Sequence, residues 1–145
     1  MSIRIALMFS GQGAQHPGMG KDFFEQYAGA RDLFREADLA LGRPLSDLCF
    51  HGSQAELTAS ANCQPGIFSV SLAAYQALQA EYPFKAQACA GLSLGEYAAL
   101  HCAGALGFAQ TLKLVARRGE LMDQACRQQN GGMAALLAVE PELIE

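Results

Sequence analysis

The chain has 145 residues, of which 51% are hydrophobic and 17% are charged, and its formal net charge at pH 7 is −4. That length is enough for one domain with a hydrophobic core but not for two large ones. The acidic balance argues against a basic surface for nucleic acid or a membrane, and no apolar run approaches the length that crosses a bilayer.

The N-terminal part of the sequence predicts a strand followed by helices. Residues 3–9 are β-branched and apolar and read as a buried strand, which ends at the glycine-rich stretch 10–15. Over residues 21–41, apolar side chains recur at three- and four-residue spacings, which predicts a helix broken into two pieces at Gly29.

Three further residues mark the expected starts of helices. Ser46 and Ser53 read as N-caps of two short helices, and Glu56 completes a capping box with Ser53. Pro65 is expected in the first turn of a longer helix, where its missing N–H costs no hydrogen bond.

The rest of the chain continues the alternation of strands and helices. A second strand is predicted at 86–90, helices at 95–102 and 108–128, and a third strand at 133–139 after a glycine-containing turn. Strands that alternate with helices predict an α/β fold, in which a parallel sheet is covered by helices on both faces.

The cysteines bear on the compartment and on metal binding. There are five of them, an odd number, and no two stand in a C-x-x-C pair. Neither a disulfide framework nor a zinc site fits that pattern, so we expect no metal. Free thiols favour a reducing compartment, and the predicted location is therefore the cytoplasm.

The most informative motif is a G-x-S-x-G pentapeptide at 91–95, between a small, apolar predicted strand and a predicted helix. This is the layout of the nucleophile elbow of an α/β-hydrolase-like sheet, in which a tight turn strains the serine backbone and requires small neighbours. The helix that follows points its free N–H groups at the site. Ser93 is therefore the predicted nucleophile, and a chance match is the alternative.

The loop at 11–15 is a candidate second part of the site. Ligands of parallel sheets bind outside the carboxyl ends of the strands, so this loop and Ser93 should share one edge. The loop lacks the lysine and spacing of a phosphate-binding loop, and it fits better as a backbone N–H donor to an oxyanion. An ordinary glycine-rich turn is the alternative.

A serine nucleophile needs a general base, and the three histidines are poor candidates. Helical rise separates His101 from Ser93 by about 12 Å, and His51 lies among short surface helices. His16 is the one histidine that could approach the site, although a loop histidine beside a proline is more often a surface residue. We therefore expect the base to lie outside this chain.

Arg117 and Arg118 lie in the middle of the helix predicted at 108–128. A guanidinium in a cleft binds a carboxylate through two parallel hydrogen bonds, which would suit an acidic acyl group. The alternative is an exposed pair of arginines bonded to Glu120 or to solvent.

Five motifs, in order, resemble the malonyl-CoA:acyl carrier protein transacylase family, which includes the acyltransferase domains of fatty acid and polyketide synthases. The motifs are residues 9–15 with the glycines at 18–20, residues 62–65, the elbow at 91–100, the stretch 118–122 and the segment 132–135. Together they span nearly the whole chain. The resemblance implies an α/β-hydrolase-like acyltransferase subdomain at 1–129 and the beginning of a ferredoxin-like small subdomain at 130–145.

The resemblance also implies roles for individual residues. Ser93 would attack malonyl-CoA, the N–H groups of Gln12 and Leu94 would hold the oxyanion, and Arg118 would bind the free malonyl carboxylate. Gln64 is implied to line the pocket. The phosphopantetheine thiol of acyl carrier protein would then take the acyl group, with no cofactor beyond the coenzyme A thioester that serves as substrate, and with the enzyme acting as a monomer.

Two departures from the family pattern change what is expected. Leu92 stands where the family usually has a histidine before the nucleophile, which bears on acyl selectivity. The family's catalytic histidine lies farther downstream, so residues 1–145 alone are expected to be a nearly inactive fragment. Two rival functions stay open: a serine hydrolase or thioesterase with the same elbow, and a non-catalytic fragment that docks a carrier protein.

Overall fold

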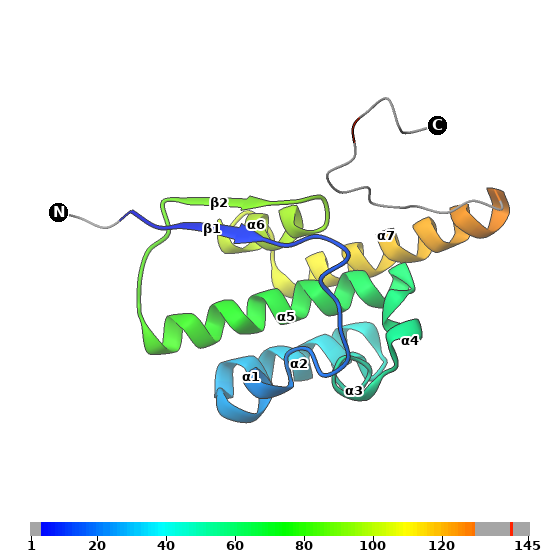
Figure 1. The fold of residues 1–145 in the computed structure, drawn as a ribbon. Coiled ribbons are helices and arrows are strands. Elements are labelled where there is room, and N and C mark those ends of the chain that lie inside the picture. The colour runs from blue at the N-terminus through cyan, green and yellow to red at the C-terminus, as the bar shows by residue number, and fades with distance from the viewer. Residues whose placement is uncertain (1–3, 130–139, 141–145) are drawn as a thin grey trace.

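A computed structural model describes residues 4–129 and residue 140. In chain order, its elements are β1 (Ala6–Phe9), α1 (Lys21–Gln26), α2 (Ala28–Leu41), α3 (Leu45–His51), α4 (Gln54–Thr58), α5 (Ser60–Glu81), β2 (Ala88–Gly91), α6 (Gly95–Cys102) and α7 (Phe108–Gln129). Figure 1 shows β1, β2 and α6 on one side of α5, α1 to α3 on the other, and α4 at the end where α5 begins; α7 packs alongside α5. The long helix α5 is thus the centre of the described part of the chain.

The two strands form a parallel pair, with Ala6 opposite Ala88 and Phe9 opposite Gly91. Phe9 is buried against the helices, whereas Met8 points to the other face and is 85% exposed. The parallel α/β arrangement confirms the predicted fold class. The prediction that both faces are covered is wrong for the described part, because alternate side chains of β1 face solvent. The third strand predicted at 133–139 and the proposed small subdomain lie outside the described residues, apart from residue 140.

Helix α5 is buried on all sides over much of its length, including the seven consecutive residues 63–69. It begins at Ser60, so the prediction that Pro65 opens it is wrong: Pro65 lies inside the helix. A proline there has no N–H for the carbonyl of Ala61, four residues earlier. The guanidinium of Arg43 takes the place of that donor and lies 2.8 Å from the Ala61 oxygen.

The break between α1 and α2 is at Tyr27, not at Gly29 as predicted. Tyr27 has extended backbone angles (φ −116°, ψ 123°), and Gly29 lies within α2. The side chain of Arg31 on α2 donates to two carbonyl oxygens at the end of α1, at 3.2 and 2.9 Å. A side-chain cap from the next helix therefore stabilises a break that periodicity alone placed two residues later.

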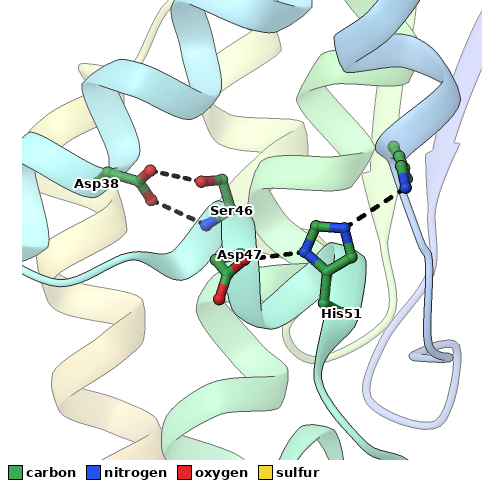
Figure 2. A network of polar contacts seen from close by, with 5 residues as sticks. Asp38, Ser46, Asp47 and His51 are labelled. Carbon is green, nitrogen blue, oxygen red and sulfur yellow. Dashed lines mark hydrogen bonds and ion pairs between the residues drawn. The ribbon is translucent and has the colours of Figure 1, made fainter.

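The short helices differ in how they begin. Ser53 and Glu56 form the predicted capping box of α4, which is confirmed. Ser46 does not cap α3, which begins at Leu45. Instead its N–H and its hydroxyl both donate to the carboxylate of Asp38 on α2, as Figure 2 shows. Ser46 therefore lies in the first turn of α3, where it is hydrogen-bonded to Asp38 of α2.

Helix α7 packs on α5 through residues three and four apart, among them the fully buried Leu112 and Val115. Leu121, in contrast, is 47% exposed. It lies two residues beyond the buried Gly119, on the opposite side of the helix. In the part of the chain that the structure describes, every helix is too short or too polar to cross a membrane.

Candidate active site

The turn between β2 and α6 has the geometry of a strained elbow. Ser93 has φ 51°, the one positive φ among the described residues other than glycine. The backbone is packed tightly on either side of it: a Cβ on Gly91 would lie 2.0 Å from the Gly95 carbonyl carbon, and a Cβ on Gly95 would lie 2.3 Å from the Phe9 oxygen. These two positions therefore accept only glycine, and the predicted strand–serine–helix turn is confirmed.

The loop after β1 reaches this elbow. The N–H of Leu92 donates to the Phe9 carbonyl at 3.1 Å, and a Cβ on Gly11 would lie 2.7 Å from the Leu92 oxygen. The two segments therefore meet at the carboxyl edge of the sheet, as predicted. Within residues 4–129, neither the Gln12 N–H nor the Leu94 N–H donates to another backbone carbonyl.

The far end of that loop is held by a thiol. The Sγ of Cys63 on α5 donates to the side-chain oxygen of Gln15 at 3.1 Å, and the same oxygen accepts the N–H of Gly13 at 2.8 Å. Burial raises the pKa of the Cys63 thiol to about 11. The thiol is therefore protonated at neutral pH and stays a donor, which anchors the loop that carries Gln12.

The arginine assigned by resemblance lies beside the serine. The Nη2 of Arg118 donates to Ser93 Oγ at 3.0 Å, and its Nη1 donates to the Oε1 of Gln64 at 2.6 Å. Gln64 is fully buried, and its Nε2 donates to the side-chain oxygen of Gln12 at 3.3 Å. One network thus joins residues from α7, α5, the elbow and the first loop. Arg117, in contrast, is exposed and pairs with Glu120 at 2.9 Å.

Two other residues of the stretch 118–122 explain how the Arg118 side chain is positioned. At Gly119 the backbones of α7 and α5 touch, and a Cβ there would lie 2.2 Å from the carbonyl oxygen of Ser60. One turn further on, the sulfur of Met122 accepts from Gln64 Nε2 at 2.9 Å. The close crossing of the two helices is what lets a side chain on α7 reach both the buried Gln64 and Ser93.

None of the three histidines is hydrogen-bonded to Ser93 in the described part of the chain. His51 pairs with Asp47 at 2.9 Å on the α3 surface, as Figure 2 shows. His16 contacts the backbone carbonyl of Ala14 in its own loop at 3.4 Å, and His101 contacts that of Leu106 in the loop after α6 at 2.9 Å. The expectation that His51 and His101 do not serve Ser93 agrees with these contacts, and His16 also lacks a hydrogen bond to it.

Two residues near the site were missed by the sequence analysis. The hydroxyl of Ser60 accepts from Gln12 Nε2 at 3.2 Å. The carboxylate of Asp123 accepts the N–H groups of Ser60 and Ala61, both at 2.9 Å. These partners are 48 to 63 residues apart in sequence, so no local pattern could have joined them.

Comparisons with known proteins identify the family of this chain. The acyl transferase domain family matches residues 7–144. A malonyl CoA-acyl carrier protein transacylase of Bacillus subtilis is 46% identical over 135 residues, which are 93% of this chain and 34% of the relative. The crystal structure of a malonyl CoA-acyl carrier protein transacylase from Clostridium perfringens matches with a TM-score of 0.79 and 37% identity, over 85% of this chain and 39% of that one.

A further solved structure contains a malonyl-transacylase in complex with a type II PKS acyl-carrier protein. It matches with a TM-score of 0.79 and 36% identity, over 85% of this chain and 40% of that one. The chain thus spans less than half of the length of these relatives. Since the family match covers nearly all of its residues, the chain belongs to the acyl transferase domain family.

Proposed function

We propose that this chain carries the nucleophile and the carboxylate-binding arginine of an S-malonyltransferase. The enzyme moves a malonyl group from malonyl-CoA to the phosphopantetheine thiol of an acyl carrier protein through a malonyl-serine ester. One observation carries the proposal: a single guanidinium, that of Arg118, donates to the nucleophile Ser93 at 3.0 Å and to the buried Gln64 at 2.6 Å.

The choice of acyl group follows from where Arg118 is held. A malonyl ester on Ser93 Oγ has its free carboxylate two carbon–carbon bonds from the ester carbonyl, so a guanidinium that reaches Oγ also reaches that carboxylate. Arginine has five N–H donors, and two of them are used in the network described above. The remaining donors bind the carboxylate, and the fixed positive charge favours an acidic acyl group over a neutral one.

In the first half-reaction, Ser93 Oγ attacks the thioester carbonyl carbon and gives up its proton to a base. The N–H groups of Gln12 and Leu94 hold the oxyanion. The intermediate collapses as the carbon–sulfur bond breaks, and coenzyme A leaves as a thiol once its sulfur is protonated. In the second half-reaction the carrier thiol attacks the ester, a new carbon–sulfur bond forms, and the serine hydroxyl is released.

The base that accepts the serine proton is assigned to a group outside residues 4–129. The support is that each of the three histidines in the described part is bonded to a residue other than Ser93. An oxyanion hole and a bound substrate without a base give only a limited residual rate. We therefore expect residues 1–145 alone to form the malonyl-serine ester far more slowly than a complete enzyme.

The same proposal includes an acyl carrier protein as partner, no cofactor and a monomeric enzyme. The structural neighbour in complex with an acyl-carrier protein supports a carrier protein as acceptor. Coenzyme A enters as the thioester of the substrate, and no other cofactor is needed for the two acyl transfers. The monomeric state and the cytoplasmic location stay predictions.

The test compares two neighbouring arginines in the full natural chain. Arg118→Ala should reduce the preference for malonyl-CoA over acetyl-CoA by about 10- to 100-fold, the worth of a charged hydrogen bond. Arg117→Ala is the matched control, because its side chain is exposed and pairs only with Glu120 in the described part. The assay measures transfer to a carrier protein, and free malonate separates a hydrolase from a transferase. An unchanged preference in Arg118→Ala would refute the proposal.

A further inference from the structure

Helix α5 begins without a cap of its own. Its N-cap residue, Ala59, offers no side-chain acceptor, and the first turn contains no acidic residue. The acceptor comes instead from α7, where the two carboxylate oxygens of Asp123 each take one N–H, from Ser60 and Ala61, at 2.9 Å. A carboxylate there satisfies two unpaired donors and interacts favourably with the positive end of the helix dipole.

The capped turn carries side chains of the active site. Ser60 Oγ accepts from Gln12 Nε2 at 3.2 Å, and Gln64, one turn later on α5, donates to Gln12 Oε1 at 3.3 Å. Both ends of the Gln12 amide are thus bound to α5. The position of this turn therefore determines where the Gln12 side chain lies, and with it the backbone N–H that we assign to the oxyanion hole.

Asp123 and Arg118 hold the same two helices together at two points. Arg118 bonds to Gln64, Asp123 bonds to the start of α5, and Gly119 lies between them in contact with the Ser60 carbonyl. Two bonded points and a close contact define both the rotation and the register of α5 against α7. Loss of one point would let the first turn of α5 shift while the hydrophobic contacts farther along the helix remain.

We propose that Asp123 is a positioning residue for the acyl transfer: its carboxylate holds the first turn of α5 and, through Ser60 and Gln64, aims Gln12 and Arg118. This inference rests on the proposed function. It assigns to Asp123 no contact with substrate. Its consequence is that the binding of the malonyl carboxylate depends on a carboxylate on the far side of Gly119 from the arginine.

The test uses Asp123→Ala and Asp123→Asn in the full natural chain. In Asp123→Ala we expect the KM for malonyl-CoA to rise about tenfold and the preference for malonyl over acetyl to fall with it, since Arg118 and its partner are no longer aligned. Asp123→Asn keeps one acceptor oxygen, so both the rise in KM and the fall in malonyl preference should be smaller. Glu120→Ala is the control, because it removes an exposed carboxylate one turn earlier on α7, and it should leave both quantities unchanged.

Thermal denaturation separates positioning from plain stabilisation. A lower Tm in both Asp123 variants, with the malonyl preference intact, would overturn the inference and leave Asp123 as a helix cap only. If Asp123→Ala does not fold, Asp123→Asn decides by the same criterion. If the unsubstituted chain does not transfer malonyl at all, the proposed function fails and the inference fails with it. Malonyl transfer with unchanged preference in the variants overturns the inference alone.

Discussion

A methyl group at Gly119 should force α7 away from α5. The separation should break the bond between Arg118 and Gln64, although neither side chain is changed by the substitution. A Cβ there would lie 2.2 Å from the Ser60 carbonyl oxygen and 2.7 Å from its carbonyl carbon. Both are backbone atoms of a buried helical turn, so neither can move aside as a side chain would. To reach ordinary van der Waals contact, the two helices must separate by about 1 Å.

Two effects of Gly119→Ala oppose each other, and their sizes decide the sign. Alanine is a better helix former than glycine by about 1 kcal/mol. Overpacking a close contact costs about 1 to 3 kcal/mol, and each strained hydrogen bond across the interface costs about 1 kcal/mol more. A separation of this size would also lengthen the Arg118–Gln64 bond from 2.6 Å to about 3.6 Å, which is too long for a hydrogen bond. We expect a net loss of stability of about 2 kcal/mol.

The measurement is the free energy of unfolding in urea, followed by circular dichroism, together with the preference for malonyl over acetyl. The matched control is Gly107→Ala, where a Cβ would meet only a side-chain oxygen at 4.0 Å. This control should change stability by less than about 0.5 kcal/mol. If Gly119→Ala is as stable as the unsubstituted chain and keeps its preference, the close crossing of α7 and α5 is not what aims Arg118.

Two further predictions concern the buried end of α5 and the thiols. Arg43→Met should lower the free energy of unfolding by about 1 to 2 kcal/mol, because the Ala61 carbonyl loses its donor. The cost should shrink in a Pro65→Ala background, which restores the N–H, and an equal cost in both backgrounds would contradict this account. Cys126 is exposed, whereas burial raises the pKa of Cys49 to about 12. A thiol reagent should therefore modify Cys126 in the native state and Cys49 only after unfolding, as mass spectrometry of peptides would reveal; similar rates would contradict the burial of Cys49.

Two of the features that sequence reasoning predicted correctly, the elbow and the capping box, are local. The elbow needs a positive φ at Ser93 and no side chain at Gly91 or Gly95, and all three requirements are met within five residues. The capping box of Ser53 and Glu56 spans four residues. In each case the chemical groups that stabilise the turn are supplied by neighbours in the chain, so the residue types alone predict the geometry.

Two of the predictions that were wrong concern residues whose partners lie on another element. Pro65 was expected to open a helix because a proline inside one leaves a carbonyl without a donor, and Arg43 supplies that donor from outside the helix. Ser46 was expected to cap α3, but it donates hydrogen bonds to the carboxylate of Asp38 on α2 instead. Propensity describes a helix in isolation, and here the neighbouring helix changed the balance.

The sequence by itself thus determined the serine on its tight turn, the parallel α/β order of the elements and the helix that carries two adjacent arginines. Which of those arginines meets the serine depends on how α7 is rotated against α5, because successive helical residues point about 100° apart. That rotation comes from bonds between residues 25 to 63 positions apart, made by Arg118 and Asp123. Such bonds form only after the helices have packed, so the contact of Arg118 with both Ser93 and Gln64 is decided by the tertiary structure.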